Sequence, residues 1–268
     1  MQQNRACITG TAATIAALLQ ASAPQNAAEP LIEVLKSAEK AFGKATADRI
    51  FYYNPDAIAS WLVQKRKIDF APLQAATDLQ LPLCSVVPPV TPVCFASMYS
   101  GLQPEEHGIQ RYEKPVLRVP TIFDTLPVAG KKIAIVSTAG DSISKIFLGR
   151  SADYFIYDTV KECNAKAFEL IEKDAYSVIV LYNGNYDHWM HRCGPEGPLA
   201  KRALKENLAT FGALKAQIAE KWASHDTVLA FAPDHGCHKM FGLLGTHGID
   251  APSDMEITHF YSYLPKSK

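Results

Sequence analysis

The sequence predicts an α/β fold in which a mostly parallel sheet is covered by helices on both faces. Short apolar segments rich in β-branched and aromatic residues alternate with longer helical patterns along the chain. Polar residues directly follow several of these apolar segments, as at the ligand-binding edge of an open α/β sheet. With 268 residues, of which 48% are hydrophobic and 20% charged, the chain can fill the core of such a domain.

The first half of the chain predicts four helices and two strands. The expected helices are Thr11–Gln20, Ala27–Phe42, Ala57–Gln64 and Pro92–Tyr99, and the expected strands are Arg49–Tyr53 and Leu83–Val87. Asn54-Pro55-Asp56 should end the first strand, and Pro88-Pro89 the second. Pro92 suits the first position of a helix.

The second half predicts strands that alternate with two long helices. The expected strands are Lys132–Ser137, Tyr154–Tyr157, Ser177–Tyr182, Thr227–Ala232 and His259–Tyr263, and the expected helices are Val160–Lys173 and Leu199–Trp222. Such alternation favours a three-layer α/β/α sandwich. No linker interrupts it, so we expect one domain over residues 1–268, with residues 1–46 as a helical N-terminal extension.

The N-terminal segment has two interpretations. Ala6 to Ala23 is mostly apolar and ends in Ala21-Ser22-Ala23, which loosely resembles a signal-peptidase site. It also carries several threonines and is preceded by a single basic residue, Arg5, which favours a helix of the folded protein. We therefore expect a cytoplasmic protein, with export as the alternative if residues 1–23 are a signal peptide. No run is long enough for a membrane span.

Charge and cysteine content exclude several classes of protein. The formal net charge is +0, which gives no electrostatic argument for nucleic acid or an anionic membrane as partner. The six cysteines form no C-x-x-C pair and are expected to be free thiols in a reducing compartment. Cys193 and Cys237 lie beside the candidate metal ligands described next, and zinc thiolates are the alternative interpretation of these two.

Three short clusters in the second half indicate a metal site. They are Asp187-x-x-x-His191, Asp234-His235-Gly236, and His247 between Thr246 and Gly248. Neutral imidazole and carboxylate are ligands that bind borderline divalent metals without thiolate. Seven of the eight histidines fall between His188 and His259.

The candidate residues share a position relative to the expected strands. Asp56, Thr91, Asp187 and Asp234 each follow a strand. If those strands are parallel, the four residues lie at one edge of the sheet. Thr91 also opens a helix, whose first N–H groups are expected to hold an oxygen of an anion.

The segment from Val90-Thr91-Pro92 to Ser100-Gly101, followed by Pro104-Glu105-Glu106-His107-Gly108-Ile109, resembles the nucleophile segment of the alkaline phosphatase superfamily. The branch it resembles contains the nucleotide pyrophosphatase/phosphodiesterases. The Asp187, Asp234 and His247 clusters match the metal motifs of that branch in the same order. The resemblance covers about Arg49 to Tyr263 and implies an alkaline phosphatase-like fold.

The resemblance also implies a function and a ligand set. One metal would be held by Asp187, His191 and His247, and a second by Asp56, Asp234 and His235. The metals would be two divalent ions, Zn²⁺ as usual for this branch or Mn²⁺ as in its mutase relatives. The chain would hydrolyse small-molecule phosphate esters, diester or monoester, through a phosphothreonine intermediate on Thr91. A phosphonate hydrolase, a phosphosugar mutase-like enzyme and a non-catalytic metal-binding relative are the alternatives.

The sequence departs from the branch at one place near the nucleophile. An Asn that binds a phosphate oxygen usually follows the His-Gly-Ile turn, whereas here Gln110-Arg111-Tyr112 stands there. Arg111 or Tyr112 is the candidate to bind that oxygen instead. The sequence also lacks the Cys/Ser-x-Pro-x-Arg pattern of sulfatases at Thr91.

Each residue also has a purely structural interpretation. Thr91 alone is most simply a helix cap. Five other histidines are expected to have no ligand role: His107 to set a turn, His188 and His238 to lie outside the ligand sets, His225 to lie at a surface turn, and His259 to lie in the core. The order of the motifs and their positions after strands favour the metal site over these readings taken together.

Overall fold

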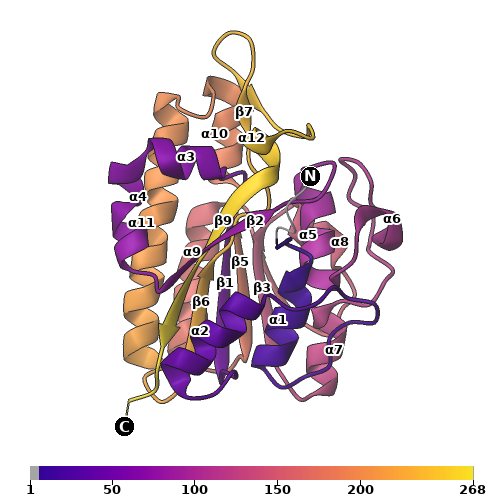
Figure 1. Cartoon of the computed structure of the whole chain (residues 1–268), viewed down its shortest axis with the longest axis vertical. Helices are drawn as coiled ribbons and strands as arrows, with labels where there is room; N and C mark the ends of the chain where they lie inside the picture. Colours follow the sequence, from indigo (N-terminus) through magenta and orange to yellow (C-terminus); the bar gives the residue numbers. More distant parts are fainter. Residues whose placement is uncertain (1–5, 268) are drawn as a thin grey trace.

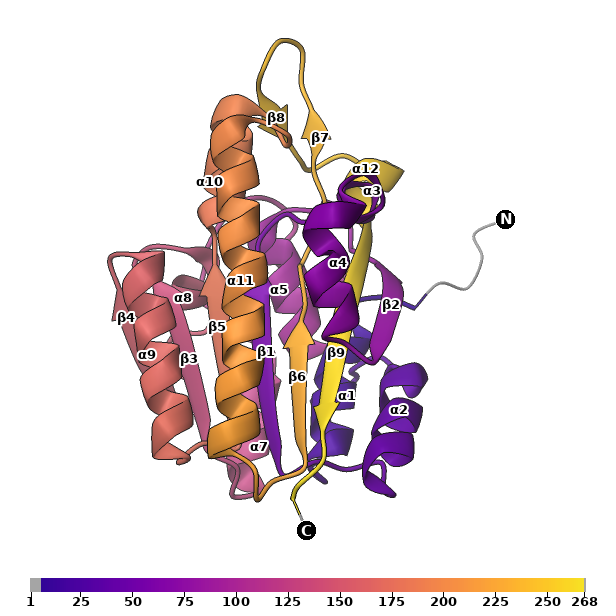
Figure 2. The ribbon, with the colours of Figure 1, turned by 90° about the vertical axis from the view of Figure 1, so that its left-hand side faces the viewer.

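The computed structural model describes residues 6–267 and contains one central seven-stranded sheet with the strand order β2-β9-β6-β1-β5-β3-β4 (Figure 2). Its strands are β1 Arg49–Pro55, β2 Leu79–Cys84, β3 Ile133–Thr138, β4 Asp153–Tyr157, β5 Val178–Asn183, β6 Thr227–Phe231 and β9 Glu256–Leu264. A separate short hairpin is made by β7 His238–Lys239 and β8 Gly245–Thr246.

The sheet is mostly parallel, as predicted. β1 is parallel to β5 and β6, and β3 is parallel to β5 and β4. β9 is antiparallel to both β6 and β2, so β2 runs in the same direction as the parallel strands. The carboxyl ends of β1, β2, β5 and β6 therefore meet at one edge.

Helices cover both faces of the sheet and make the predicted three-layer sandwich (Figures 1 and 2). One face is covered by α1 Gly10–Leu18, α2 Ile32–Phe42, α5 Thr91–Ser100, α7 Ile122–Val128 and α8 Ser142–Ile146. The other is covered by α3 Ser60–Lys65, α4 Lys67–Ala75, α9 Val160–Lys173, α10 Asn185–Cys193 and α11 Pro198–Lys221. The short helices α6 Pro104–His107 and α12 Pro252–Met255 lie in connecting segments.

Two hydrophobic cores result from the alternation of side chains along the strands. In β1, Ile50 and Tyr52 contribute to one core, and Phe51 and Tyr53 contribute to the other. Because successive strand residues point to opposite faces, a strand between two helical layers is buried on both faces and is mostly apolar. Every residue of β5 is buried accordingly.

Several predicted boundaries were wrong, among them the start of α2, which lies at Ile32 rather than Ala27, and the start of β9, which lies at Glu256 rather than His259. β1 continues through Pro55, which pairs with Asn183, and α3 begins at Ser60 rather than Ala57 because Ala57 has a left-handed backbone with φ +63°. β2 begins before the predicted position and contains Pro82. An edge strand tolerates proline because one side of it needs no N–H for pairing.

The predicted N-terminal helix is present as α1 and is buried along most of its length. Its threonines are compatible with burial because Thr14 donates to the Gly10 carbonyl at 2.7 Å and accepts from Leu31 N at 2.7 Å. Arg5, the basic residue before this segment, lies outside the described residues. Among residues 6–267, no helix combines the length and apolarity needed to cross a membrane.

Candidate metal centre

The carboxyl edge of the sheet brings together the seven residues that the sequence singled out as ligands and nucleophile. Asp56 follows β1, and Asp234 and His235 follow β6. Helix α10 follows β5 and carries Asp187 and His191, four residues apart and hence on one helix face. Thr91 is the first residue of α5, and His247 follows β8.

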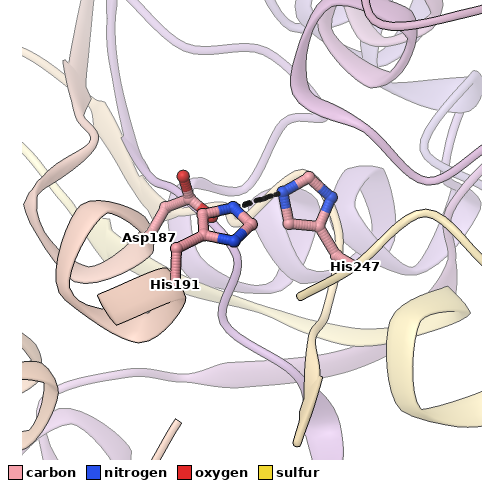
Figure 3. Close-up of side chains that lie close together, drawn as sticks. All are labelled: Asp187, His191 and His247. Atoms are coloured by element: carbon pink, nitrogen blue, oxygen red, sulfur yellow. Dashed lines mark hydrogen bonds and ion pairs between the residues drawn. The ribbon is translucent and has the colours of Figure 1, made fainter. Parts of the chain in front are cut away.

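The first group consists of Asp187, His191 and His247 (Figure 3). Their side-chain donor atoms form a nearly equilateral triangle. Asp187 Oδ1 lies 3.3 Å from His191 Nε2 and 3.4 Å from His247 Nε2, and the two Nε2 atoms are 3.2 Å apart. A tetrahedral ion with donors at about 2.0–2.1 Å separates each pair of donors by about 3.3–3.4 Å. The triangle therefore fits one face of a zinc-type coordination tetrahedron.

The second group consists of Asp56, Asp234 and His235, all buried. His235 Nε2 lies 3.4 Å from Asp56 Oδ1 and 3.4 Å from Asp234 Oδ2. Thr91 Oγ1 lies 3.3 Å from the same Nε2 atom and 3.3 Å from Asp56 Oδ2. The hydroxyl of Thr91 thus borders the second group of donors.

The backbone fixes the tautomer of all three histidines. The Nδ1 atoms of His191, His235 and His247 lie 3.1, 2.9 and 3.1 Å from the carbonyl oxygens of Gly245, Gly236 and Pro89. A carbonyl oxygen can only accept, so each Nδ1 carries the proton. Each Nε2 is left with a lone pair directed at the donor groups, the arrangement found in metal-binding histidines. The facing lone pairs of His191 and His247 need a positive charge between them, either a proton or a metal ion.

The surrounding carboxylates favour a metal ion over a proton as this charge. Asp56 Oδ1, Asp187 Oδ1 and Asp234 Oδ2 are buried oxygens with no hydrogen-bond partner within residues 6–267. Burial and the neighbouring Asp234 and Asp187 carboxylates raise the pKa of Asp56 well above its usual range. Burial raises the pKa of Asp234 to about 7. A divalent cation bound here would satisfy these oxygens and offset the repulsion between the carboxylates.

The environment of His235 agrees with a ligand role, whereas the contact with Asp187 raises the pKa of His191. Burial lowers the pKa of His235, which keeps its imidazole in the neutral, metal-binding form. Burial alone would raise the pKa of Asp187, but its interactions with His191 and His247 outweigh this and hold the pKa below its usual range. The residues present therefore fit two divalent ions.

Tyr182, which the sequence did not single out, also belongs to this centre. Its hydroxyl donates a hydrogen bond to Asp56 Oδ2, the oxygen that also accepts from Thr91. The contact orients Asp56 so that Oδ1 faces the donor group with His235. Tyr182 sits near the end of β5, and only the register of β5 against β1 brings the two side chains together.

Asp254 is a second residue that the sequence did not reveal. This fully buried carboxylate lies 2.8 Å from His238 Nδ1 and accepts from Ile249 N at 3.2 Å, and its backbone carbonyl accepts from Gly236 N at 2.7 Å. Ile249 follows His247 by two residues, and Gly236 follows His235 directly. Asp254 therefore ties together the loops that supply one histidine to each group.

We expect Asp254→Ala to weaken both the fold and the metal centre. Loss of a buried charged acceptor leaves Ile249 N and His238 without partners, which should lower the free energy of unfolding of the metal-free protein by roughly 2–4 kcal/mol. Looser histidine loops should lower metal affinity by roughly 10–100-fold. Denaturant unfolding in chelator and calorimetric zinc titration measure the two effects. Asp250→Ala, an exposed carboxylate in the same loop, is the control and should change neither. Unchanged metal affinity in Asp254→Ala would show that the contacts of Asp254 are not needed to position the histidine loops.

The other candidate residues lie as follows. Arg111 is exposed and pairs with Glu113 at 2.9 Å, and Tyr112 is exposed beneath the Lys114 ammonium. Their role in binding a phosphate oxygen stays a prediction. His107, as predicted, sets the turn after α5, with Nε2 3.0 Å from Ser97 Oγ and with Nδ1 accepting from Ile109 N at 3.2 Å.

The remaining histidines and cysteines take no part in the two groups of donors. His188 is exposed beside Arg192, and His259 is a buried core residue whose Nε2 lies 2.8 Å from the Pro233 carbonyl. His225 lies 2.8 Å from Asp174. Cys193 and Cys237 are free, and neither belongs to a donor group.

One expectation about the start of α5 needs correction. Pro92 has no N–H, and the N–H groups of Val93 and Cys94 both donate to the Val90 carbonyl at 3.0 Å. The backbone groups after Thr91 are therefore not free to bind an anion. The N–H of Thr91 itself is the donor that this helix start can offer.

Comparison with known proteins identifies the fold. No family model matches the chain, and no curated protein sequence matches it. Among solved structures, murine ectonucleotide pyrophosphatase/phosphodiesterase 5, determined as an inactive threonine-to-alanine variant in complex with AMP, aligns with a TM-score of 0.57 and 17% identity over 72% of this chain. Phosphonoacetate hydrolase from Sinorhizobium meliloti in complex with phosphonoformate aligns with a TM-score of 0.52 and 19% identity over 70% of this chain.

These alignments confirm the predicted alkaline phosphatase-like fold. The chain spans 58% of the length of the murine structure and 56% of the bacterial one. At this level of identity, the likeness establishes the fold and leaves the chemistry to the residues themselves.

Proposed function

We propose that the chain is a metal-dependent hydrolase of phosphate esters in which Thr91 is the nucleophile. One observation carries the proposal: two groups of metal-type donors converge at one sheet edge, and a buried threonine hydroxyl borders one of them. The solved structures with this fold support it, since their descriptions name a phosphodiesterase and a phosphonate hydrolase. The threonine-to-alanine change in the inactive murine protein supports a threonine nucleophile.

The residues of this chain prepare the attack in three ways. Thr91 Oγ1 donates to Asp56 Oδ2 at 3.3 Å, so the hydroxyl is held beside the second group of donors. Tyr182 holds that same carboxylate oxygen in place. Burial of Thr91 in the first turn of α5 keeps its hydroxyl apart from bulk water.

The reaction proceeds in two steps. Thr91 Oγ1 forms a bond to phosphorus while the bond from phosphorus to the leaving oxygen breaks, and the proton of the Thr91 hydroxyl passes to the leaving oxygen, which gives a phosphothreonine and an alcohol. A water oxygen then bonds to phosphorus, the bond from phosphorus to Oγ1 breaks, and a proton of that water restores the hydroxyl of Thr91 as the phosphate product leaves. Two divalent ions, one held by Asp187, His191 and His247 and the other by Asp56, Asp234 and His235, would supply positive charge beside the reacting oxygens. The donor set suits zinc and also accepts manganese.

A substrate panel tests the proposed function. We expect zinc- or manganese-loaded protein to release p-nitrophenolate from p-nitrophenyl phosphate, from bis-p-nitrophenyl phosphate, or from both. The ratio of the two kcat/KM values assigns monoester or diester preference. Thr91→Ala, purified in parallel, controls for contaminating phosphatases. If wild type and variant are equally inactive on every ester with metal bound, the hydrolase proposal fails.

Phosphonate hydrolysis is a second candidate because phosphonoacetate hydrolase shares the fold. Here the bond from phosphorus to carbon would break in place of the ester bond. Release of inorganic phosphate from phosphonoacetate in the same panel, with no p-nitrophenolate from either ester, would select this candidate.

A further inference from the structure

The β7–β8 hairpin presents an apolar tip that the proposed chemistry does not use. It extends from the body of the molecule at the metal-centre end of the sheet (Figures 1 and 2). The tip, defined as Met240–Leu244, carries four large apolar side chains in its five residues. Phe241 is completely exposed, Leu243 is 78% exposed, and Met240 and Leu244 are each 46% exposed. Apolar side chains gathered in this way mark an interaction site, whereas scattered ones do not.

The base of the hairpin is stabilised by backbone pairing and by packing against α10. His238 pairs with Thr246 and Lys239 pairs with Gly245, and Met240 N donates to the Leu244 carbonyl at 2.9 Å. Gly242 has a left-handed backbone with φ +86°, which the tight turn requires. A side chain at Gly245 would come within 2.8 Å of the Met190 carbonyl, so β8 lies directly against α10. The base of the hairpin is therefore packed against α10, and the tip projects from it.

Cationic side chains lie beside the tip, and the acidic residue near them is paired with a lysine. From His238 to Ile249 the sequence has no acidic residue, and Lys239 is its one lysine or arginine. Lys239 and Leu243 line a cavity of about 360 Å³ together with the exposed Arg192 of α10. The acidic residue of that cavity, Glu196, is paired with Lys65 at 2.5 Å. The surroundings of the tip thus favour an anionic partner.

The size and shape of the tip favour a lipid surface over a protein. A stable protein interface buries about 800 Å² on each partner, more than five residues on a convex turn can supply. A lipid surface needs only a few inserted apolar side chains, aided by cations that contact the lipid phosphates. Overall composition, with a net charge of +0, gave no reason to expect this partner.

We propose that the Met240–Leu244 tip docks the protein reversibly on anionic lipid surfaces, with Lys239 and Arg192 contacting lipid phosphates. His247 follows the hairpin directly, and His235 precedes it by three residues. Docking would therefore hold the metal centre close to the lipid surface. The proposal concerns binding alone and does not depend on turnover by the proposed site.

Vesicle flotation tests the docking. Wild type is mixed with phosphatidylcholine vesicles that contain or lack phosphatidylglycerol. We expect it to float with the phosphatidylglycerol vesicles. The double variant Phe241→Ser/Leu243→Ser should partition roughly ten- to hundredfold less because its apolar insertion is lost. Lys239→Ala/Arg192→Ala should lose the preference for phosphatidylglycerol. Ile68→Ser removes an apolar side chain that is 91% exposed on α4 and should behave like wild type.

Light scattering of the same proteins without vesicles tests whether the tip instead binds a second copy of the chain. Wild type that does not float, or an apolar double variant that floats as well as wild type, overturns the proposal. A dimer that depends on Phe241 and Leu243, without vesicle binding, also overturns it and assigns the tip to a second copy of the chain. Because no substrate is present, none of these results bears on the hydrolase proposal.

Discussion

Thr91→Ala is expected to lower kcat on every ester that the wild type hydrolyses by at least about a thousandfold, with metal content unchanged. The variant removes the oxygen that forms the bond to phosphorus, and loss of a covalent nucleophile has effects of this size or larger. The six metal-type donors do not include Thr91, so both donor groups stay complete. A thousandfold fall corresponds to about 4 kcal/mol of transition-state stabilisation.

Thr91→Ser supplies the matched control. Serine keeps the hydroxyl near Asp56 and His235 and removes only the methyl group, so it should retain part of the turnover. Single-turnover kinetics with mass spectrometry should detect phosphorylated protein for wild type and Thr91→Ser, and none for Thr91→Ala. Full activity in Thr91→Ala would eliminate the covalent route and indicate direct attack by water.

His247→Ala is expected to reduce metal content from about two ions to about one. The first group would keep only Asp187 and His191, and two protein ligands hold zinc poorly. Asp56, Asp234 and His235 stay unchanged, so the second ion should be retained. Activity should fall far more steeply for esters with poor leaving groups than for p-nitrophenyl esters, since the lost ion is the one expected to stabilise the leaving oxygen.

His188→Ala is the control for this change. His188 lies on α10 beside Asp187 but is exposed and contacts Arg192, so its loss should leave both metals and the rates unchanged. If His247→Ala kept two metals and normal rates, the closing ligand would be another residue. His238 and His188 would then be the histidines to test.

The sequence could place the candidate ligand residues together because the fold positions them by a simple rule. Asp56, Asp187 and Asp234 each follow a strand, and a parallel sheet brings such positions to one edge. The apolar runs of β1, β5 and β6 were clear enough to place those edges. His247 follows no strand of the central sheet, so only its motif indicated it.

The supporting residues could not be found in this way. The contact of Tyr182 with Asp56 depends on the pairing of β5 with β1, and the contacts of Asp254 depend on the packing of a four-residue helix against two loops. Neither residue belongs to a motif or a periodic pattern. Helix α4 was missed for a related reason: it is short, directly follows α3 and contains Pro72, which is unfavourable inside a helix.

The hairpin was also absent from the predicted elements. Its strands are only two residues long, and its apolar tip faces outward, which no alternation of buried and exposed residues would indicate. Periodic patterns of apolar residues indicate which side chains are buried in a core, and the apolar side chains of this tip are not packed in one. Its role can be inferred only after the fold shows that it is exposed.

The metal content of the purified protein tests the central claim most directly. Protein prepared without chelator, reconstituted with zinc and freed of excess by gel filtration, is analysed by inductively coupled plasma mass spectrometry. Two donor groups of three ligands each predict about two zinc ions per chain. A value near zero in repeated, correctly folded preparations would contradict the account, because the unpartnered carboxylate oxygens and convergent imidazoles would then need another explanation.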